Sequence, residues 1–203
     1  GMGEPFLNYK NSIAAADLLH HSKGINMAAW RITISTAGVV SKIRQFAEEE
    51  QPYKLAVSLN GSTHEQRLKT MPITQTHTFS NLINASKDYA YNSRNRITFE
   101  YVLMDGINDE PQDAERLIRL LGSIECKLNM IPYNEIGGVY NRPSDERIEA
   151  FMEPLKRAPF PVTVRWSKGT DIDAGCGQLV TNSIRSEERR VGKEGRSRWS
   201  PYH

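Results

Sequence analysis

The chain has 203 residues, of which 38% are hydrophobic and 25% charged, a composition typical of one globular domain and not of a fibrous or disordered protein. Its two cysteines are too few for a disulfide framework, and no apolar run approaches the roughly 20 residues needed to span a bilayer, so we expect a cytoplasmic protein without a membrane segment. The formal net charge of +2 comes from the last 19 residues, which hold six basic and three acidic side chains. The rest of the chain is close to neutral.

The basic segment over residues 185–203 would normally suggest a nucleic-acid-binding arm. It resembles instead the translation of a common sequencing-library adapter, with Gly195 where that translation has cysteine. The segment also lacks apolar periodicity, so its composition predicts disorder. We therefore expect one domain over residues 1–184 and a non-native, disordered tail over residues 185–203.

Predicted strands and helices alternate along residues 1–184. Strands are expected over residues 31–35, 54–59, 97–104, 127–131 and 162–166, where β-branched and apolar residues are concentrated. Helices are expected at the apolar positions with helical spacing over residues 13–19, 39–46, 79–90, 111–121 and 144–155. The first helix should begin after Asn11 or Ser12, the stretch around Met71 should be a loop, and Pro154 should kink or end the last helix. This alternation predicts right-handed βαβ units and an α/β fold with a mainly parallel sheet.

Polar residues follow several of the predicted strands, at the end where parallel sheets bind ligands. They are Ser35, Thr36, Ser58, Asn60 and Asn134, and the pair Gly3-Glu4 would join them if a further strand preceded it. Each residue taken singly is typical of a helix cap or a turn. Together they surround one face of the sheet, which favours a binding site.

Cys176 lies between Gly175 and Gly177, so a ligand could approach its sulfur closely. A thiol in this position would be a nucleophile once deprotonated, and the alternative is a small buried hydrophobic residue. Cys126 stands at the start of a predicted strand, so we expect it to be structural. The five histidines show no metal-ligand spacing.

Six short motifs occur in an order and spacing that resemble a known family. They are GMGEPFLN at residues 1–8, ISTAGV at 34–39, VSLN at 57–60, FEYV at 99–102, KLNMIPYN at 127–134 and DIDAGCGQL at 171–179. They resemble the C-terminal part of the radical S-adenosylmethionine (SAM) enzymes that methylate C2 of an adenine in 23S rRNA and in some tRNAs. The resemblance covers residues 1 to about 184 and implies a partial (β/α)6 barrel whose first strands are missing at the N-terminus.

The resemblance also implies site residues. Gly3 and Glu4 match the motif that holds the amino-acid end of SAM, and Cys176 matches the cysteine that is itself methylated. The other positions that match SAM-binding residues are Ser35, Ser58, Leu59, Asn60 and Asn134. Carboxylates, hydroxyls and amides suit the α-ammonium, ribose and adenine groups of SAM.

The mechanism that the resemblance implies uses two SAM molecules. The Cys176 thiolate takes a methyl group from the first, and a reduced [4Fe–4S] cluster cleaves the second to a 5′-deoxyadenosyl radical. This radical abstracts hydrogen from the S-methyl group, the methylene radical adds to adenine C2, and a second cysteine releases the RNA by forming a disulfide with Cys176. The implied partners of this cytoplasmic monomer are 23S rRNA, tRNA and a reductant for the cluster.

Several positions depart from the family pattern. The family usually has His at Asn60, Ala at Gly175 and Arg at Lys168. The sequence also contains no Cys-x3-Cys-x2-Cys motif, so the cluster ligands would precede residue 1, together with the first barrel strands, the N-terminal RNA-binding extension and the resolving cysteine. We therefore expect a C-terminal fragment that is inactive on its own.

Three alternatives stay open at this stage. The first is the related enzyme that methylates adenine at C8 and shares the cysteine chemistry. The second is a non-catalytic remnant that binds SAM or RNA, which the missing cluster motif favours. The third is a βα-barrel enzyme that uses Cys176 for acyl transfer, although no His-Asp arrangement accompanies the cysteine.

Overall fold

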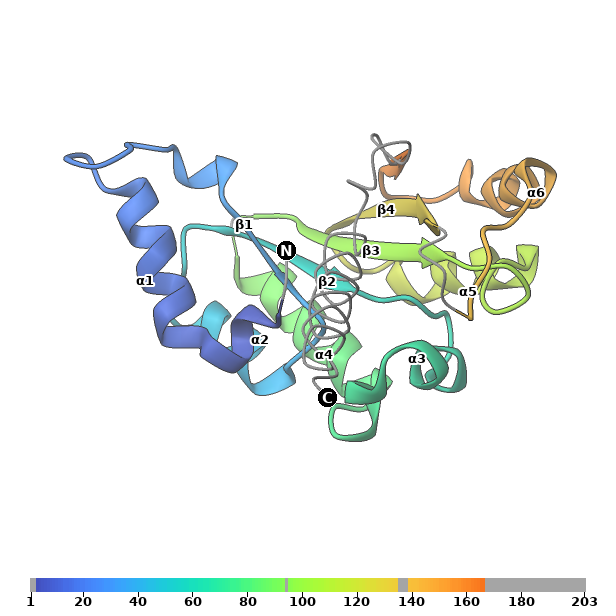
Figure 1. Ribbon diagram of the computed structural model, residues 1–203, viewed down its shortest axis with the longest axis horizontal. Helices are drawn as coiled ribbons and strands as arrows, with labels where there is room; N and C mark the ends of the chain where they lie inside the picture. Colours follow the sequence, from blue (N-terminus) through green and yellow to red (C-terminus); the bar gives the residue numbers. More distant parts are fainter. Residues whose placement is uncertain (1–2, 94, 135–138, 167–203) are drawn as a thin grey trace, which may run out of the picture.

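Five parallel strands form a single sheet in the computed structural model, which describes residues 3–93, 95–134 and 139–166 (Figure 1). The strands are β1 (Thr33–Thr36), β2 (Lys54–Ser58), β3 (Ile97–Leu103), β4 (Cys126–Pro132) and β5 (Val162–Val164), and they pair in that order. The helices are α1 (Tyr9–His20), α2 (Val40–Glu48), α3 (His64–Thr70), α4 (Phe79–Asn92), α5 (Pro111–Leu121) and α6 (Asp145–Leu155). Three 3₁₀ helices join them: η1 (Pro5–Asn8), η2 (Ala29–Arg31) and η3 (Pro72–Gln75). The predicted α/β fold with a parallel sheet is confirmed.

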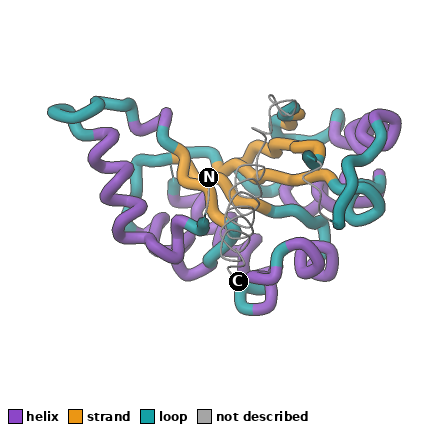
Figure 2. The backbone as a smooth tube through the Cα atoms, in the orientation of Figure 1, coloured by secondary structure: helices purple, strands orange, loops and turns teal. Residues whose placement is uncertain are grey.

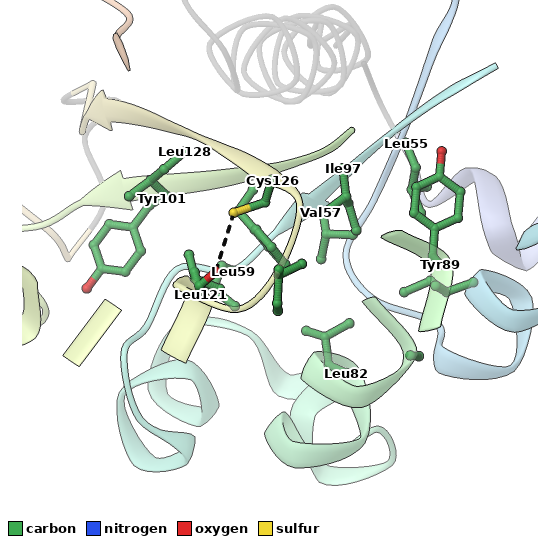
Figure 3. Close-up of a cluster of buried hydrophobic side chains, with 14 of the residues drawn as sticks. Leu55, Val57, Leu59, Leu82, Tyr89, Ile97, Tyr101, Leu121, Cys126 and Leu128 are labelled. Carbon is green, nitrogen blue, oxygen red and sulfur yellow. Dashed lines mark hydrogen bonds between the residues drawn. The ribbon is translucent and has the colours of Figure 1, made fainter. Parts of the chain in front are cut away.

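Strand alternation places the core on one face of this sheet. In β3 and β4 every second residue is buried, beginning at Ile97 and at Cys126. The buried side chains of the helices join the same cluster, as Leu82 and Tyr89 of α4 do in Figure 3. The strands therefore form one layer whose apolar face is covered by helices, with α1 at one end of the molecule and α6 at the other (Figures 1 and 2).

The N-terminal and C-terminal boundaries of several elements differ from the prediction. The first helix begins at Tyr9, before Asn11, because Pro5 starts a 3₁₀ turn that leads directly into it. The first strand is shifted to Thr33–Thr36, since residues Ala29–Arg31 form η2, and the last strand ends at Val164. Pro154 lies in the last turn of α6, which ends one residue later, as expected for a proline near a helix end.

The prediction of a loop around Met71 was wrong for the residues before it. Residues His64–Thr70 form α3, whose N-cap Thr63 accepts a hydrogen bond from the backbone of Gln66. Polar residues dominate this short helix, so apolar periodicity does not reveal it, and the signal that could have done so is the Thr63 cap. Among the described helices, none is long and apolar enough to cross a membrane.

The structural role predicted for Cys126 is confirmed, because its side chain is almost fully buried at the first residue of β4. Its sulfur lies 3.9 Å from the Leu121 carbonyl oxygen, the contact drawn as a dashed line in Figure 3. Burial in this apolar cluster raises the pKa of the Cys126 thiol to about 12. The thiol is therefore neutral and unreactive at physiological pH.

Candidate functional site

Glu4 fastens the N-terminal segment to the carboxyl end of β1. Its Oε1 accepts hydrogen bonds from the Phe6 backbone at 3.0 Å and from the Thr36 hydroxyl at 2.7 Å, and its Oε2 accepts one from the Ala37 backbone at 2.5 Å. A carboxylate offers about four lone-pair positions, so these three bonds leave room for one more donor, on Oε2. Gly3, just before it, has φ +81, a left-handed conformation that favours glycine.

Ser35 and Ser58 lie on neighbouring strands and on the same face of the sheet, opposite the core. The register pairs Ser35 of β1 with Ala56 of β2, so Ser58 stands two residues further along on the same side. The Ser35 hydroxyl donates a hydrogen bond to Glu100 Oε2 at 3.3 Å, and Ser58 is the register partner of Glu100. The structure thus brings the two serines together around Glu100, a residue to which the sequence interpretation gave no role.

Leu59 and Asn60 continue the chain beyond β2. Leu59 is fully buried in the core, so only its backbone could meet a ligand. Asn60 has φ +51, and its Oδ1 accepts a hydrogen bond from the Val102 backbone at 2.9 Å. The Asn60 amide nitrogen lies 3.5 Å from Met71 Sδ, a weak acceptor. Asn60 therefore joins the ends of β2 and β3, with its side-chain oxygen already used by the protein.

Asn134 follows β4 and is partly exposed at the same carboxyl edge of the sheet. The residue before it, Tyr133, donates its backbone N–H to the Leu103 carbonyl at 3.0 Å, which continues the pairing of β3 and β4 past the strand ends. Cys176 and the rest of its motif, like the predicted tail, lie outside the described residues.

Arg67 is the site-supporting residue that sequence reasoning missed. It is fully buried, and its Nη2 donates hydrogen bonds to the Ala37 carbonyl and, at 3.3 Å, to the Ser58 carbonyl, while Nη1 donates to the Thr74 hydroxyl at 2.5 Å. Burial lowers the pKa of Arg67 to about 10, so the guanidinium stays charged at neutral pH. The cation therefore holds together the ends of β1 and β2, directly beside Glu4's partner Ala37.

Two glycines allow this close packing around Arg67. A Cβ on Gly38, whose φ is +109, would lie 3.0 Å from Arg67 Nη2. A Cβ on Gly61 would lie 2.7 Å from the Arg67 backbone nitrogen. Both values are tighter than ordinary side-chain contacts, so each glycine is required where the chain passes the arginine.

A second missed residue, Asn108, ties the loop after β3 to the same edge. Its side-chain nitrogen donates to the Asn60 carbonyl at 3.1 Å and to the Val102 carbonyl at 2.8 Å, and its Oδ1 accepts from the Met104 backbone at 2.8 Å. These long-range contacts of a buried amide leave no pattern in the sequence.

The described residues contain no group of three or more His, Cys, Asp or Glu side chains placed to hold a metal ion. The full sequence has two cysteines, whereas a [4Fe–4S] cluster is typically held by about four cysteine thiolates. The cysteines of this chain are therefore too few to hold the cluster that the resemblance implies.

Two open cavities of about 420 and 490 Å³ lie at the opposite end of the sheet, between the C-terminal ends of α2 and α4. Both include Ala47, Glu50 and Asn92 in their lining. These helix ends lead into the amino ends of β2 and β3, where a parallel α/β sheet does not bind its substrate. We therefore place the candidate site at the carboxyl edge.

Two solved structures are similar in fold to this chain. A radical SAM methyltransferase from Sphaerobacter thermophilus superimposes with a TM-score of 0.84 and 43% identity over 88% of this chain and 52% of that one. A domain of a pyruvate-formate lyase-activating enzyme from Bacteroides vulgatus, at 13% identity and a TM-score of 0.64 over 81% of this chain and 96% of that one, shares the fold alone. No protein-family profile matches the chain. The chain therefore shares its fold and much of its sequence with about half of a radical SAM methyltransferase.

Curated proteins show which methyltransferases this chain is similar to. The dual-specificity RNA methyltransferase RlmN of Syntrophobacter fumaroxidans is 42% identical over 89% of this chain and 53% of its own length. RlmN of Anaeromyxobacter dehalogenans is 43% identical over 94% of this chain and 51% of its own length. Over the part that aligns, the chain is similar to RlmN proteins, and it spans about half the length of the curated relatives it matches.

Proposed function

We propose that this chain is part of an enzyme that transfers a SAM-derived methyl group through Cys176 to C2 of adenine in 23S rRNA and tRNA. The observation that carries the proposal is the 43% identity with a radical SAM methyltransferase whose structure superimposes over 88% of this chain. The RNA substrate comes from the curated relatives, which are named as dual-specificity RNA methyltransferases. We also propose that the protein is a cytoplasmic monomer whose partners are RNA and a reductant for the cluster.

The carboxyl edge of the sheet is the proposed SAM site. The one free lone-pair position of Glu4 suits one N–H of the α-ammonium group, and Gly3 beside it leaves its backbone accessible. Ser35, Ser58 and Asn134 offer hydroxyl and amide groups for the rest of the molecule. Leu59 would contribute its backbone alone, and Asn60 would contribute its amide nitrogen, because its oxygen already accepts from Val102.

Cys176 is the proposed methyl acceptor. Its thiolate attacks the methyl carbon of SAM, so that an S–CH₃ bond forms on the protein while the sulfonium C–S bond breaks and neutral S-adenosylhomocysteine leaves. The flanking Gly175 and Gly177 remove side chains that would obstruct this approach. The cluster that supplies the radical chemistry would be held by the part of the relatives that this chain does not span.

A chimera tests the proposal. This chain would be joined to the part of the Syntrophobacter fumaroxidans relative that it does not cover, and reconstituted anaerobically with iron, sulfide, reductant, SAM and RNA. We expect C2-methyladenine in the RNA and its loss in the Cys176→Ala variant, with 5′-deoxyadenosine still formed. Methylated RNA from the Cys176→Ala chimera would refute the role of Cys176, and methylation at C8 would refute the proposed position.

The 203-residue chain by itself should bind SAM without cleaving it. Reductive cleavage needs a cluster with three cysteine ligands, and this sequence has two cysteines. Production of 5′-deoxyadenosine by the isolated chain, measured under the same anaerobic conditions, would contradict this expectation.

A further inference from the structure

Glu100 occupies the centre of the sheet face that is turned away from the helix-covered core. The register places Ser58, Glu100, Asn129 and Thr163 side by side on β2, β3, β4 and β5, so one row of polar side chains crosses four strands. All four are at least partly exposed. Glu100 is the one acidic residue of this row, and neither the sequence motifs nor the relatives' names assign it a role.

The carboxylate of Glu100 has one protein partner in the described part of the chain, the Ser35 hydroxyl, which donates to Oε2 at 3.3 Å. It forms no ion pair there, whereas the acidic residues Asp109 and Asp113 are each paired with an arginine. Lys127 stands one row away on β4, opposite Thr98, and in the described part of the chain it makes no ion pair with Glu100. Glu100 thus keeps Oε1 and its negative charge available on the open face.

The direction of the Ser35 hydrogen bond decides what the pair can bind. A hydroxyl carries one proton, and Ser35 gives that proton to Glu100 because an ionised carboxylate can only accept. Ser35 Oγ then offers lone pairs alone, as Glu100 Oε1 does. Two neighbouring groups that can only accept will attract a hydrogen-bond donor and repel a carboxylate.

We propose that Glu100 is a positioning residue for SAM: it holds the Ser35 hydroxyl as an acceptor, so that the two residues together bind a donor group of SAM. This inference rests on the proposed SAM site. The donor is an N–H of the α-ammonium or an O–H of the ribose, and both present the same chemistry to the pair. The carboxylate of the methionine part is excluded from this position by the charge of Glu100.

The test is an NMR titration of the ¹⁵N-labelled 203-residue chain with SAM and two analogues, one without the α-amino group and one without the ribose hydroxyls. Glu100→Gln can turn its amide N–H toward Ser35 and free the serine proton, so we expect SAM to bind about tenfold or more weakly. One analogue, the one that lacks the bound donor, should bind the wild-type and Gln variants equally. If that analogue is the one without the α-amino group, the bound donor is the α-ammonium. If it is the one without the ribose hydroxyls, the bound donor is a ribose O–H.

Two further variants separate positioning from a general loss of structure. Ser35→Ala should weaken SAM binding about as much as Glu100→Gln, and the double variant should be no weaker than either, because both changes remove one paired contact. Thr98→Val is the matched control, since Thr98 lies on the same strand and face as Glu100 but is separated from Ser35 by Ala56 of β2. This variant should bind SAM like wild type.

Equal SAM affinity in the wild-type and Glu100→Gln chains would overturn the inference while leaving the SAM site in place. A uniform loss across all three ligands would also overturn it, because it would indicate a general structural defect. If the wild-type chain showed no response to SAM, the proposed SAM site would fail, and this inference would fail with it.

Discussion

Arg67 shows how much the candidate site depends on a single buried side chain. Its guanidinium donates to the Ala37 and Ser58 carbonyls, which would be left without this donor if the charge were removed. We expect Arg67→Met to lower the free energy of unfolding by about 2–4 kcal/mol. Urea denaturation would measure the change, with Arg119→Met on the exposed side of α5 as a control that should shift it by less than about 0.5 kcal/mol. A stable Arg67→Met protein would contradict this account of the strand ends.

Cys126 gives a prediction of reactivity and of pH dependence. Burial raises its pKa to about 12, so at pH 8 the native chain should hold roughly a thousandfold less Cys126 thiolate than the unfolded chain. In a Cys176→Ala background, alkylation by iodoacetamide should therefore be slow until denaturant unfolds the protein. Rapid alkylation of the native protein at pH 8 would show that the Cys126 thiol is accessible and would contradict its burial in the core.

The pH dependence follows from the same shift. The unfolded thiol loses its proton near pH 9 while the folded one keeps it until about pH 12, so the unfolded state binds fewer protons between these values. The stability contributed by the neutral thiol is fully present below pH 9 and is lost as the pH rises from there. Cys126→Ala should flatten this part of the stability curve, measured by denaturation at pH 8 and pH 10.

At the scale of elements, Asn108 connects the loop after β3 to the end of β2. Asn108→Asp keeps the shape but replaces the amide donor with an acceptor that faces the Asn60 and Val102 carbonyls. We expect a loss of about 2–4 kcal/mol in the free energy of unfolding, because two buried donors disappear and a charge is buried. Asn84→Asp on the exposed side of α4 is the control, and an equally small effect of both changes would contradict the network.

The elements also show what the sequence could and could not predict. The strands were predicted because β-branched and apolar residues are concentrated in them, and α5 because its apolar residues follow Pro111 at helical spacing. The polar helix α3 was missed, and Arg67 with it, because neither follows an apolar period. Glu100 was overlooked for a related reason: the motif around it matched the family, but the register that places it beside Ser35 exists only in the folded sheet.

At the scale of the whole molecule, the parallel sheet separates two ends with different properties. The carboxyl edge gathers Glu4, Ser35, Ser58 and Asn134, supported from below by the buried Arg67. The amino edge carries the open cavities near Glu50 and Asn92. A parallel α/β fold binds its ligand at the carboxyl ends of its strands, so SAM is predicted at the carboxyl edge and not at the amino edge.

The most direct measurement is a map of backbone amide shifts in the ¹⁵N-labelled chain as SAM is added. The account predicts that the shifts concentrate at Ser35, Ala37, Ser58 and Glu100, while the amides of Glu50 and Asn92 at the other end stay unchanged. Shifts confined to the cavities near Glu50 and Asn92, or no shifts at SAM concentrations in the millimolar range, would contradict it.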